Sequence, residues 1–429
     1  MNASLKIFLV KLRWFLFERI TSVLDFVLYA IHVPVSGRSN PKRNEKKVIV
    51  YLGEQLPPRI PRIAKWVKRS GEYSTVLVCS QRGYFEKFSN NEFDAVFLFR
   101  NEFHLKRILK QLPKISLIHA FAPKSYYPNL ARQIVKAPFV LDMQDVYSIY
   151  YGLNPTLGWL KKELPHEKEC LEKADGIVAH SLEPNVALRK YGIKKKPKTI
   201  FFPLYCDDDA FLNGPSHPSG MEGDNTFSSS PSGRSGGALH LVYAGGVAGS
   251  HRNPKQYGNI QFHEIINILS KQKIHFHIYP SPSNIPADYE EYEKISKQNS
   301  FFHFHEPVAQ DKLAIELSKY NFGILFFFKG VSEQSDDKLK YATTLKLFNY
   351  LEAGIPIIVA KDLGYQSWIV ERNQSGLTIE NINDLASLKE KILQLNYETL
   401  LQSVKERRIG LSIKANTDRI LKFYSVIQR

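Results

Sequence analysis

Residues 244–255 combine glycines with cations at a spacing that suits phosphate binding. Ala244-Gly245-Gly246-Val247-Ala248-Gly249 follows an apolar run that predicts a strand. Glycines after a strand let backbone N–H groups approach a diphosphate closely. Arg252 and Lys255 come next and offer two cations for two phosphates, and arginine can bind phosphate oxygens in bidentate fashion. A solvated basic loop is the alternative interpretation of these residues.

The stretch 343–360 is the second segment with chemical potential. Its lysine-bearing helical pattern ends at Gly354, passes Pro356 and becomes an apolar strand. Such junctions lie at the edge where open parallel sheets bind ligands. Thr343 and Thr344 precede the helical pattern, where hydroxyl and amide groups can contact a phosphate.

Strands and helices alternate on both sides of a segment rich in Gly, Ser and Pro, residues 213–238, which we interpret as a linker. This alternation predicts an α/β protein with two doubly wound parallel sheets. The first-half strands are expected at 46–53, 74–79, 95–99, 117–121, 139–143, 176–180 and 199–202. Those of the second half are expected at 239–246, 275–279, 301–305, 323–327 and 355–359. The domains would span residues 45–212 and 239–412, followed by a terminal helix, 413–429, that packs back on the first domain.

Composition supports a folded protein in a reducing compartment. The 429 residues suffice for two domains, and a chain with 43% hydrophobic and 12% aromatic residues is not disordered. Three scattered cysteines have no metal-like spacing and cannot all pair. The run Asp207-Asp208-Asp209 could bind a hard metal ion, but its place at a domain exit favours a structural or hinge use.

Positive charge is concentrated near the start of the chain. The net charge is +16, and residues 1–70 hold 14 Lys/Arg against 4 Asp/Glu. Residues 5–35 are rich in apolar side chains with interspersed charges, and their least charged part, 20–35, is shorter than the roughly 20 residues of a spanning helix. We therefore expect residues 1–44 to be a helical extension lying on an anionic membrane surface. A core helix or a docked helical hairpin is the alternative, and the charge accompanies no nucleic-acid-binding motif.

Several motifs together resemble the nucleotide-sugar glycosyltransferases of the GT-B fold, especially family 4. The stretch 343–360 is similar to the helix that cradles the donor diphosphate and ribose in that family. Four first-half segments resemble the family's elements in order: 116–123, 140–147, 172–181 and 202–211. The resemblance covers most of residues 46–380. It implies two Rossmann-like domains facing a cleft, the first for the acceptor and the second for the donor.

The resemblance also implies roles for individual residues. The donor-binding positions would be Gly245, Gly246, Arg252, Lys255, Thr344, Lys346, Asn349 and Glu352. The catalytic positions, at strand ends of the first domain, would be His119, Asp142 and Asp145. Two positions depart from the family, because Asn349 replaces the glutamate that holds the ribose and Tyr341 replaces a second glutamate. Both changes place the identity of the donor in question.

The predicted function is transfer of a sugar from a nucleoside diphosphate-sugar to a lipid-linked or polysaccharide acceptor, with retention of configuration. The enzyme would act in polysaccharide biosynthesis at the cytoplasmic face of the cell membrane, as a peripheral or monotopic protein. The resemblance implies no metal and no cofactor besides the sugar nucleotide. Two alternatives remain, a non-catalytic GT-B partner of a glycan-assembly complex and a nucleotide-sugar epimerase.

Overall fold

The computed structural model describes residues 20–28, 46–81, 92–212, 238–332 and 335–429. The chain forms two compact units: unit 1 is Met1–His180, Pro184–Phe202 and Thr417–Arg429, and unit 2 is Ser181–Glu183 and Pro203–Asn416. Almost all of the predicted linker lies outside the described residues, as does the predicted N-terminal extension except for a helix at 20–28. Within the described ranges, no helix is long and apolar enough to cross a membrane.

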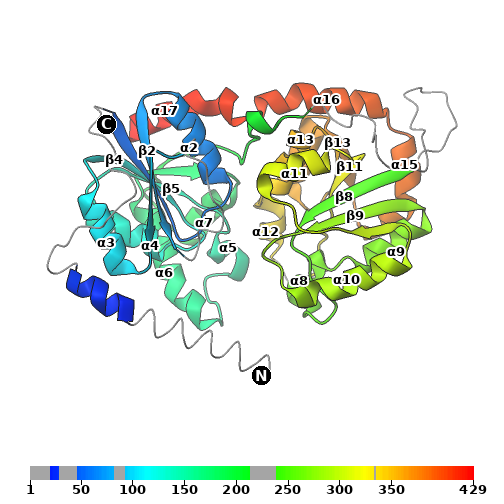
Figure 1. The fold of residues 1–429 in the computed structure, drawn as a ribbon, viewed down its shortest axis with the longest axis horizontal. Coiled ribbons are helices and arrows are strands. Elements are labelled where there is room, and N and C mark those ends of the chain that lie inside the picture. The colour runs from blue at the N-terminus through cyan, green and yellow to red at the C-terminus, as the bar shows by residue number, and fades with distance from the viewer. Residues whose placement is uncertain (1–19, 29–45, 82–91, 213–237, 333–334) are drawn as a thin grey trace. The chain divides into compact units, whose positions relative to one another are not determined.

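Unit 1 is built on a parallel sheet that has seven strands in the described residues, in the order β3-β2-β1-β4-β5-β6-β7 (Figure 1). Its strands are β1 (Lys47–Gly53), β2 (Tyr73–Ser80), β3 (Ala95–Phe99), β4 (Ile115–Phe121), β5 (Phe139–Asp142), β6 (Gly176–Ala179) and β7 (Lys198–Phe201). The central strand β1 is buried from Val48 to Gly53, as its near-continuous apolar run predicts.

The helices of unit 1 are α2 (Arg59–Arg69), α3 (Glu102–Gln111), α4 (Tyr126–Ile134), α5 (Tyr147–Tyr151), α6 (Gly158–Lys173), α7 (Glu183–Lys190) and the end of α17 (Ile413–Ile427). The α17 helix returns to the first sheet, since a Cβ added to Gly176 on β6 would collide with Phe423 and Ile427. Lys198 on β7 donates to the carbonyl of Val426 at 3.2 Å. The last helix is therefore part of the packing of unit 1.

Unit 2 contains a parallel sheet that has six strands in the described residues, in the order β10-β9-β8-β11-β12-β13. The strands are β8 (Leu239–Gly245), β9 (Ile274–Pro280), β10 (Phe302–Phe304), β11 (Phe322–Leu325), β12 (Ile357–Ala360) and β13 (Gly376–Ile379). Its helices are α8 (Pro254–Tyr257), α9 (His263–Lys271), α10 (Pro286–Gln298), α11 (Gln310–Leu317), α12 (Asp336–Tyr341), α13 (Leu345–Ala353), α14 (Gly364–Arg372), α15 (Leu388–Leu393) and α16 (Tyr397–Gly410), with 3₁₀ turns η1 (Asp208–Ala210), η2 (Gly258–Ile260) and η3 (Ile382–Ser387).

Both faces of the unit 2 sheet are covered. On one face Leu241 and Tyr243 of β8 join an apolar core that includes Phe262 and Ile266. On the other, α13 packs so closely that a Cβ on Gly323 would collide with the Tyr350 ring. This two-layer cover explains why the strands read as continuous apolar runs.

In each sheet the strand order reverses once, between β1 and β4 in unit 1 and between β8 and β11 in unit 2. At such a switch point the loops leave in opposite directions and open a crevice at the carboxyl ends of the strands. The predicted fold of two doubly wound parallel sheets is confirmed. The end of α13 is also as predicted, because Gly354 adopts a left-handed φ of 76° and stops the helix.

Two elements differ from what the sequence predicts. Its pattern predicts a helical stretch from about Arg62 to Arg69, whereas the α2 helix begins at Arg59, because Pro61 lies in its first turn, where a missing N–H costs no helical hydrogen bond. The edge strand β13 was not predicted at all. It is only four residues long, starts with Gly376 and is half-exposed over its first three residues, so it lacks a strand-like pattern.

Candidate active site

The loop after β8 meets the first turn of α13 at the switch point of the unit 2 sheet. Gly245 ends β8, and a Cβ at this position would collide with the Lys346 side chain. The Lys346 Nζ lies 5.5 Å from the ring centroid of Tyr243 and 5.8 Å from that of Phe327. The Tyr243 hydroxyl donates to the carbonyl of Gly246 at 2.9 Å. The ammonium group of Lys346 thus lies beside the glycine loop, where a side chain at position 245 would displace it.

The beginning of α13 adds further hydrogen-bond donors to this place. Thr344 is the N-cap, and its side chain makes no capping hydrogen bond. In the described structure the Thr343 hydroxyl is buried without a hydrogen-bond partner. The first N–H groups of a helix have no partner within the helix and carry the positive end of its dipole. Together with Lys346, this turn is suited to an anion such as a phosphate group.

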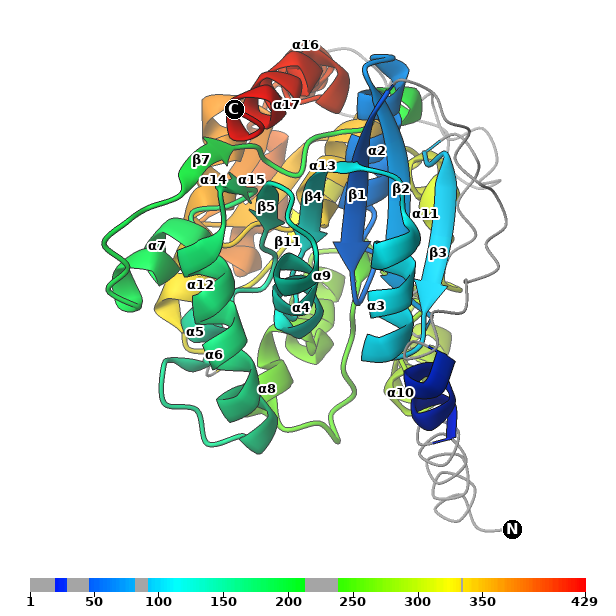
Figure 2. The ribbon, with the colours of Figure 1, turned by 90° about the vertical axis from the view of Figure 1, so that its left-hand side faces the viewer.

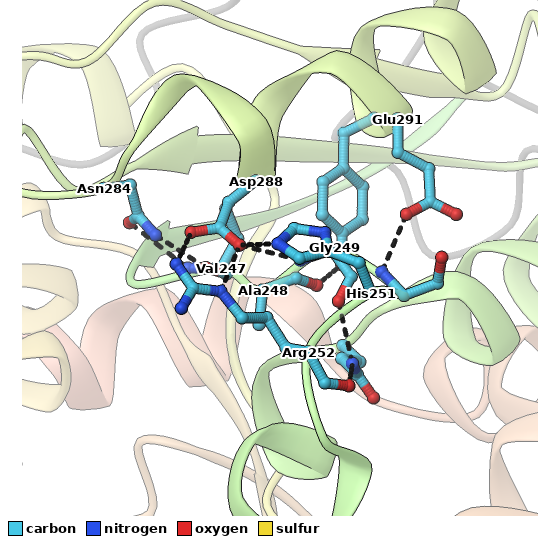
Figure 3. Close-up of polar contacts among 11 residues, drawn as sticks. Val247, Ala248, Gly249, His251, Arg252, Asn284, Asp288 and Glu291 are labelled. Atoms are coloured by element: carbon cyan, nitrogen blue, oxygen red, sulfur yellow. Dashed lines mark hydrogen bonds and ion pairs between the residues drawn. The ribbon is translucent and has the colours of Figure 1, made fainter. Parts of the chain in front are cut away.

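Arg252 is tied into the scaffold of the glycine loop. Asp288 on α10 accepts hydrogen bonds from Arg252 Nε and Nη2, both at 2.9 Å, and from the Gly249 N–H at 3.2 Å (Figure 3). Asn284 binds the N–H and the carbonyl of Val247 at 3.3 and 2.6 Å. The Arg252 guanidinium lowers the pKa of Asp288 below its usual value. Two N–H groups of the Arg252 guanidinium therefore already donate to a carboxylate. A phosphate contact of Arg252 stays a prediction.

The remaining predicted donor residues differ in their surroundings. The Asn349 side chain is 5% exposed, and its Oδ1 accepts from Gln310 Nε2 at 3.3 Å. Glu352 is 1% exposed, and its carboxylate accepts from the Asp207 N–H at 2.8 Å. Lys255 is an exposed residue of the short helix α8. The structure therefore directs the Glu352 carboxylate to the main chain at Asp207, and the donor contacts of Asn349 and Lys255 stay predictions.

In unit 1, His119 and Asp142 belong to a fully buried polar network, and both side chains are 0% exposed. Asp142 Oδ2 accepts from Arg59 Nε at 2.7 Å and lies 3.3 Å from His119 Nε2. The other ring nitrogen of His119, Nδ1, lies 2.6 Å from the Tyr424 hydroxyl. We call these four residues the unit 1 polar network. It ties β4 and β5 to α2 and to α17.

Charges within the unit 1 polar network compensate one another. Burial raises the pKa of Asp142, but the Arg59 guanidinium and the hydrogen bond from His119 more than offset this and lower it to about 2. Arg59 also donates to the Phe202 carbonyl at 2.7 Å. Asp142 Oδ1 is buried and has no hydrogen-bond partner within the described residues. A substrate contact of His119 or Asp142 stays a prediction. In the structure both side chains bind Arg59 or Tyr424 within the core of unit 1.

Other acidic residues gather at the carboxyl ends of the unit 1 strands. Asp145, after β5, has a left-handed φ of 57°, which few residues other than glycine adopt. Glu54, after β1, pairs with Lys124, after β4, at 3.0 Å. Glu163 on α6 accepts a hydrogen bond from the Ser125 N–H, and burial raises its pKa to about 7. A carboxyl group that titrates near neutral pH beside strand ends is suited to proton transfer.

The acidic run at 207–209 makes hydrogen bonds to main-chain N–H groups within unit 2. Asp207 Oδ1 accepts from the Asp209 N–H at 3.3 Å, and Asp208 Oδ2 accepts from the Lys414 N–H at 3.0 Å. These carboxylates cap η1 and the first turn of α17. Among the residues that the structure describes, no group of three or more His, Cys, Asp or Glu side chains is placed to hold a metal ion.

Sequence reasoning missed four residues that matter here: Arg59, Glu163, Asp288 and Tyr424. Arg59 follows two prolines at a helix start, a signal that could have placed it in a first turn. The other three lie in ordinary amphipathic helices. Their partners are 36 or more residues away in sequence, so no local pattern reveals them.

Comparisons with known proteins bear on both units. Residues 257–422 match the model of a family described as "Glucosyltransferase 3-like, C-terminal domain". This range contains α13 with Lys346. No curated protein sequence matches the chain. The match to a glucosyltransferase domain supports the predicted transferase activity.

Solved structures share the fold at low sequence identity. Anabaena Alr3699/HepE in complex with UDP-glucose has a TM-score of 0.58 at 12% identity and covers 88% of this chain and 99% of that chain. The N-terminal domain of Candida albicans trehalose-6-phosphate phosphatase has a TM-score of 0.57 at 11% identity, covering 92% and 99%. TcCGT1 in complex with UDP has a TM-score of 0.54 at 10% identity, covering 89% and 100%. The resemblance to GT-B glycosyltransferases is confirmed at the level of fold.

Proposed function

We propose that this GT-B protein transfers a sugar from a nucleoside diphosphate-sugar and binds the donor diphosphate between the glycine loop and α13. The observation that carries the proposal is the contact of Gly245 with Lys346 at the switch point of the unit 2 sheet. The absence of a side chain at position 245 lets Lys346 lie against the main chain of the loop. Lys346 and the N-terminal turn of α13 supply positive charge at the same place.

The proposed sugar transfer requires stabilisation of the negative charge that develops on the leaving diphosphate. When the bond between sugar and diphosphate breaks, negative charge builds on the leaving diphosphate, and donors fixed beforehand stabilise it. Lys346 and the N–H groups of the α13 turn would perform this task. Thr343 would donate its hydroxyl hydrogen to a phosphate oxygen, which would give this buried group a partner. The sugar carbon becomes oxocarbenium-like, as in glycoside hydrolysis.

The proposed donor is a UDP-sugar, and the proposed acceptor is a glycan or a lipid-linked molecule. A UDP-sugar, with UDP-glucose first, is supported by the glucosyltransferase family over residues 257–422 and by the UDP-glucose bound to a protein of the same fold. We propose a lipid-linked or polysaccharide acceptor, a retaining mechanism and a role in polysaccharide biosynthesis. The protein would work at the cytoplasmic face of the membrane without a metal ion. The basic and apolar sequence of residues 1–44 supports this location.

Donor binding provides the first test. Purified protein is heated with UDP-, GDP-, ADP- and dTDP-sugars, since a ligand that binds the native state raises the apparent Tm. UDP-glucose is expected to raise Tm for the wild type and to lose this effect in Lys346→Ala. Lys319→Ala is the matched control, because Lys319 is a half-exposed lysine of the same unit that pairs with Glu316 at 2.7 Å. Its Tm should respond to the donor as the wild type does.

Release of nucleoside diphosphate then separates an enzyme from a binding protein. With UDP-glucose alone we expect slow hydrolysis, and with membrane lipid or glycan extract faster release of UDP. Donor binding without any release of UDP, under both conditions, would favour a non-catalytic partner. Conversion of the donor to another sugar nucleotide without an acceptor would favour an epimerase.

A further inference from the structure

Residues 20–28 form a helix whose apolar side is turned toward solvent. Ile20, Val23, Leu24 and Val27 follow the i, i+3, i+4, i+7 spacing of one helix face. Their exposed fractions are 67%, 66%, 50% and 45%. A helix on the surface of a soluble protein normally buries such a face against the core. In helix 20–28 the apolar side faces solvent and the polar side faces unit 1.

The polar side of this helix docks on unit 1. Asp25 is 0% exposed, and its Oδ2 accepts from Arg100 Nε at 2.6 Å and from Asn101 Nδ2 at 2.8 Å. Its Oδ1 accepts from Arg100 Nη2 at 2.8 Å and from Arg107 Nη1 at 3.2 Å. Thr21, one turn earlier, is also buried. A buried carboxylate with four donors fixes the rotation of the helix about its axis, so the apolar face must point outward.

A second exposed apolar group lies on unit 1, around the loop from α5 to α6. Tyr151, Leu153, Leu157 and Trp159 have exposed fractions of 45%, 42%, 46% and 46%. Rings of tryptophan and tyrosine, with an apolar body and a polar tip, are enriched where proteins meet lipid headgroups. Figures 1 and 2 show the dark blue helix 20–28 and the start of α6 toward the same, lower end of unit 1.

Positive charge accompanies both apolar groups. Lys161 and Lys162, two and three residues after Trp159 on α6, are exposed. The sequence on either side of helix 20–28 adds an excess of Lys and Arg. Exposed apolar side chains next to an excess of Lys and Arg are not typical of a protein core or of the centre of a protein–protein interface. Apolar side chains bordered by exposed lysines fit the surface of an anionic bilayer.

We propose that this end of unit 1 is a membrane-docking surface, in which the buried Asp25 holds helix 20–28 with its apolar face toward an anionic lipid bilayer. The inference rests on the proposed membrane location and deepens it, because it names the surface and its lipid partner. The docking is that of a helix lying in the interface. Unit 1 would thereby be held at the layer where a lipid-linked acceptor presents its headgroup.

Vesicle binding tests the proposal without any need for sugar transfer. The full chain is sedimented with vesicles of phosphatidylcholine, with and without phosphatidylglycerol, and the bound fraction is measured. We expect binding to the anionic vesicles that weakens with salt. In Val23→Ser/Leu24→Ser/Val27→Ser, affinity for these vesicles should fall about tenfold or more, since three apolar side chains no longer enter the lipid. Leu153→Ser/Leu157→Ser should weaken binding independently.

The matched control replaces three equally exposed apolar residues of unit 2. Ile315→Ser/Leu393→Ser/Ile409→Ser removes side chains with exposed fractions of 54%, 70% and 58%. It should bind anionic vesicles like the wild type. Wild-type binding by the helix variant would overturn the proposal and assign the membrane affinity to other segments. Unchanged vesicle binding with a dimer that becomes a monomer would instead make this face a contact between copies of the chain.

A fluorescent probe reports the orientation directly. The three native cysteines are buried, so a cysteine introduced at Leu24 can be labelled selectively with a polarity-sensitive dye. With anionic vesicles, emission from Leu24→Cys should shift to the blue, and emission from Leu393→Cys should not. An unshifted Leu24→Cys signal in vesicle-bound protein would show that this face does not meet lipid. Either result leaves donor binding to be judged by its own assay.

Discussion

The two units use charged residues near strand ends in opposite ways. In unit 1 His119 and Asp142 are 0% exposed and are bound to Arg59 and Tyr424 of the same unit. In unit 2 Lys346 lies beside a glycine loop and over two aromatic rings, at the start of a helix. The first arrangement compensates charge internally, whereas the second places a cation at the start of a helix, a setting suited to an incoming anion. A position at a strand end is therefore weak evidence of substrate contact until burial and partners are known.

Asp142→Asn should have the largest effect and tests the structural half of this comparison. The substitution leaves the Arg59 guanidinium, 1% exposed, without its carboxylate. Breaking a buried ion pair from one side typically costs about 3–5 kcal/mol of stability. We expect a much lower Tm for unit 1, measured by thermal unfolding followed by circular dichroism.

Glu169→Gln is the control for that loss. Glu169 pairs with Arg132 at 2.6 Å on the surface of the same unit, with 40% of its side chain exposed. Its loss should change stability by only about 0–1 kcal/mol. An Asp142→Asn protein with the wild-type Tm and no transfer activity would make Asp142 a catalytic residue and remove the contrast between the units.

Lys346→Ala tests the other half of the comparison, the proposed anion-binding role of unit 2. Removing one preorganised group that stabilises developing charge typically lowers the rate about 10²–10³-fold, or about 2.7–4 kcal/mol. We expect a loss of this size in kcat/KM for UDP-glucose, with the Tm of the free protein nearly unchanged. Lys346→Arg should restore part of the activity because the charge remains. A variant with normal kinetics would place the diphosphate elsewhere.

The fold was largely predictable from sequence, for a physical reason. Strands of a parallel sheet are buried on both faces, so they appear as continuous apolar runs between helical periods. Val76 to Cys79 of β2 and Ile357 to Ala360 of β12 are such runs, and both are buried. The missed strand β13 lies at an edge, where burial on both faces is not required and the pattern is lost.

The site was predictable only in part. Lys346 and Gly245 were found because a helix start and a glycine loop have local signatures, and the structure brings them together. Whether His119 is open to a ligand depends on Tyr424, which is 305 residues away. The pairing of Arg252 with Asp288 is equally non-local. Local patterns show which elements can meet at a sheet edge, but long-range packing decides which side chains stay available.

Glu163→Gln should show a pH-dependent effect of intermediate size. The pKa of Glu163 rises from 4.5 to about 7, chiefly by burial and further through Glu167 and Glu54. The folded state then binds more protons than the unfolded state between these two pH values, so stability falls as pH rises through this window. Glu163→Gln should be more stable than the wild type at pH above 7, by on the order of 1–3 kcal/mol, and similar to it at acidic pH.

The exposed Glu172 of the same helix provides the control. Glu172→Gln should leave the difference in Tm between acidic and alkaline buffer as in the wild type. A wild-type pH profile of Tm in Glu163→Gln would mean that the carboxyl group is not held in a desolvated state. If activity also falls at neutral pH while stability rises, Glu163 would gain a role in proton transfer to or from the acceptor.

A double-mutant cycle on Arg252 and Asp288 sharpens the description of unit 2. Arg252→Ala and Asp288→Ala should each weaken UDP-glucose binding, because each removes one side of the pair that organises the loop. The double variant should be little worse than either single variant, with a coupling energy of about 0.5–3 kcal/mol. Additive losses in titration calorimetry would instead indicate that Arg252 contacts the phosphate independently of Asp288.

Tyr424→Phe should have the smallest effect and addresses the role of His119. It removes only the hydroxyl that lies 2.6 Å from His119 Nδ1 and keeps the ring that packs in α17. The net value of such a hydrogen bond is about 1 kcal/mol. Tyr397→Phe in unit 2, which loses a 2.9 Å hydrogen bond to the Asn321 carbonyl, is the matched change and should cost a similar amount of stability.

If His119 only anchors α17, both variants keep the wild-type kcat and the wild-type dependence of kcat on pH. If His119 instead exchanges a proton with substrate, losing the group that orients its ring will lower kcat and shift its dependence on pH in Tyr424→Phe alone, and the two units would then share the chemistry.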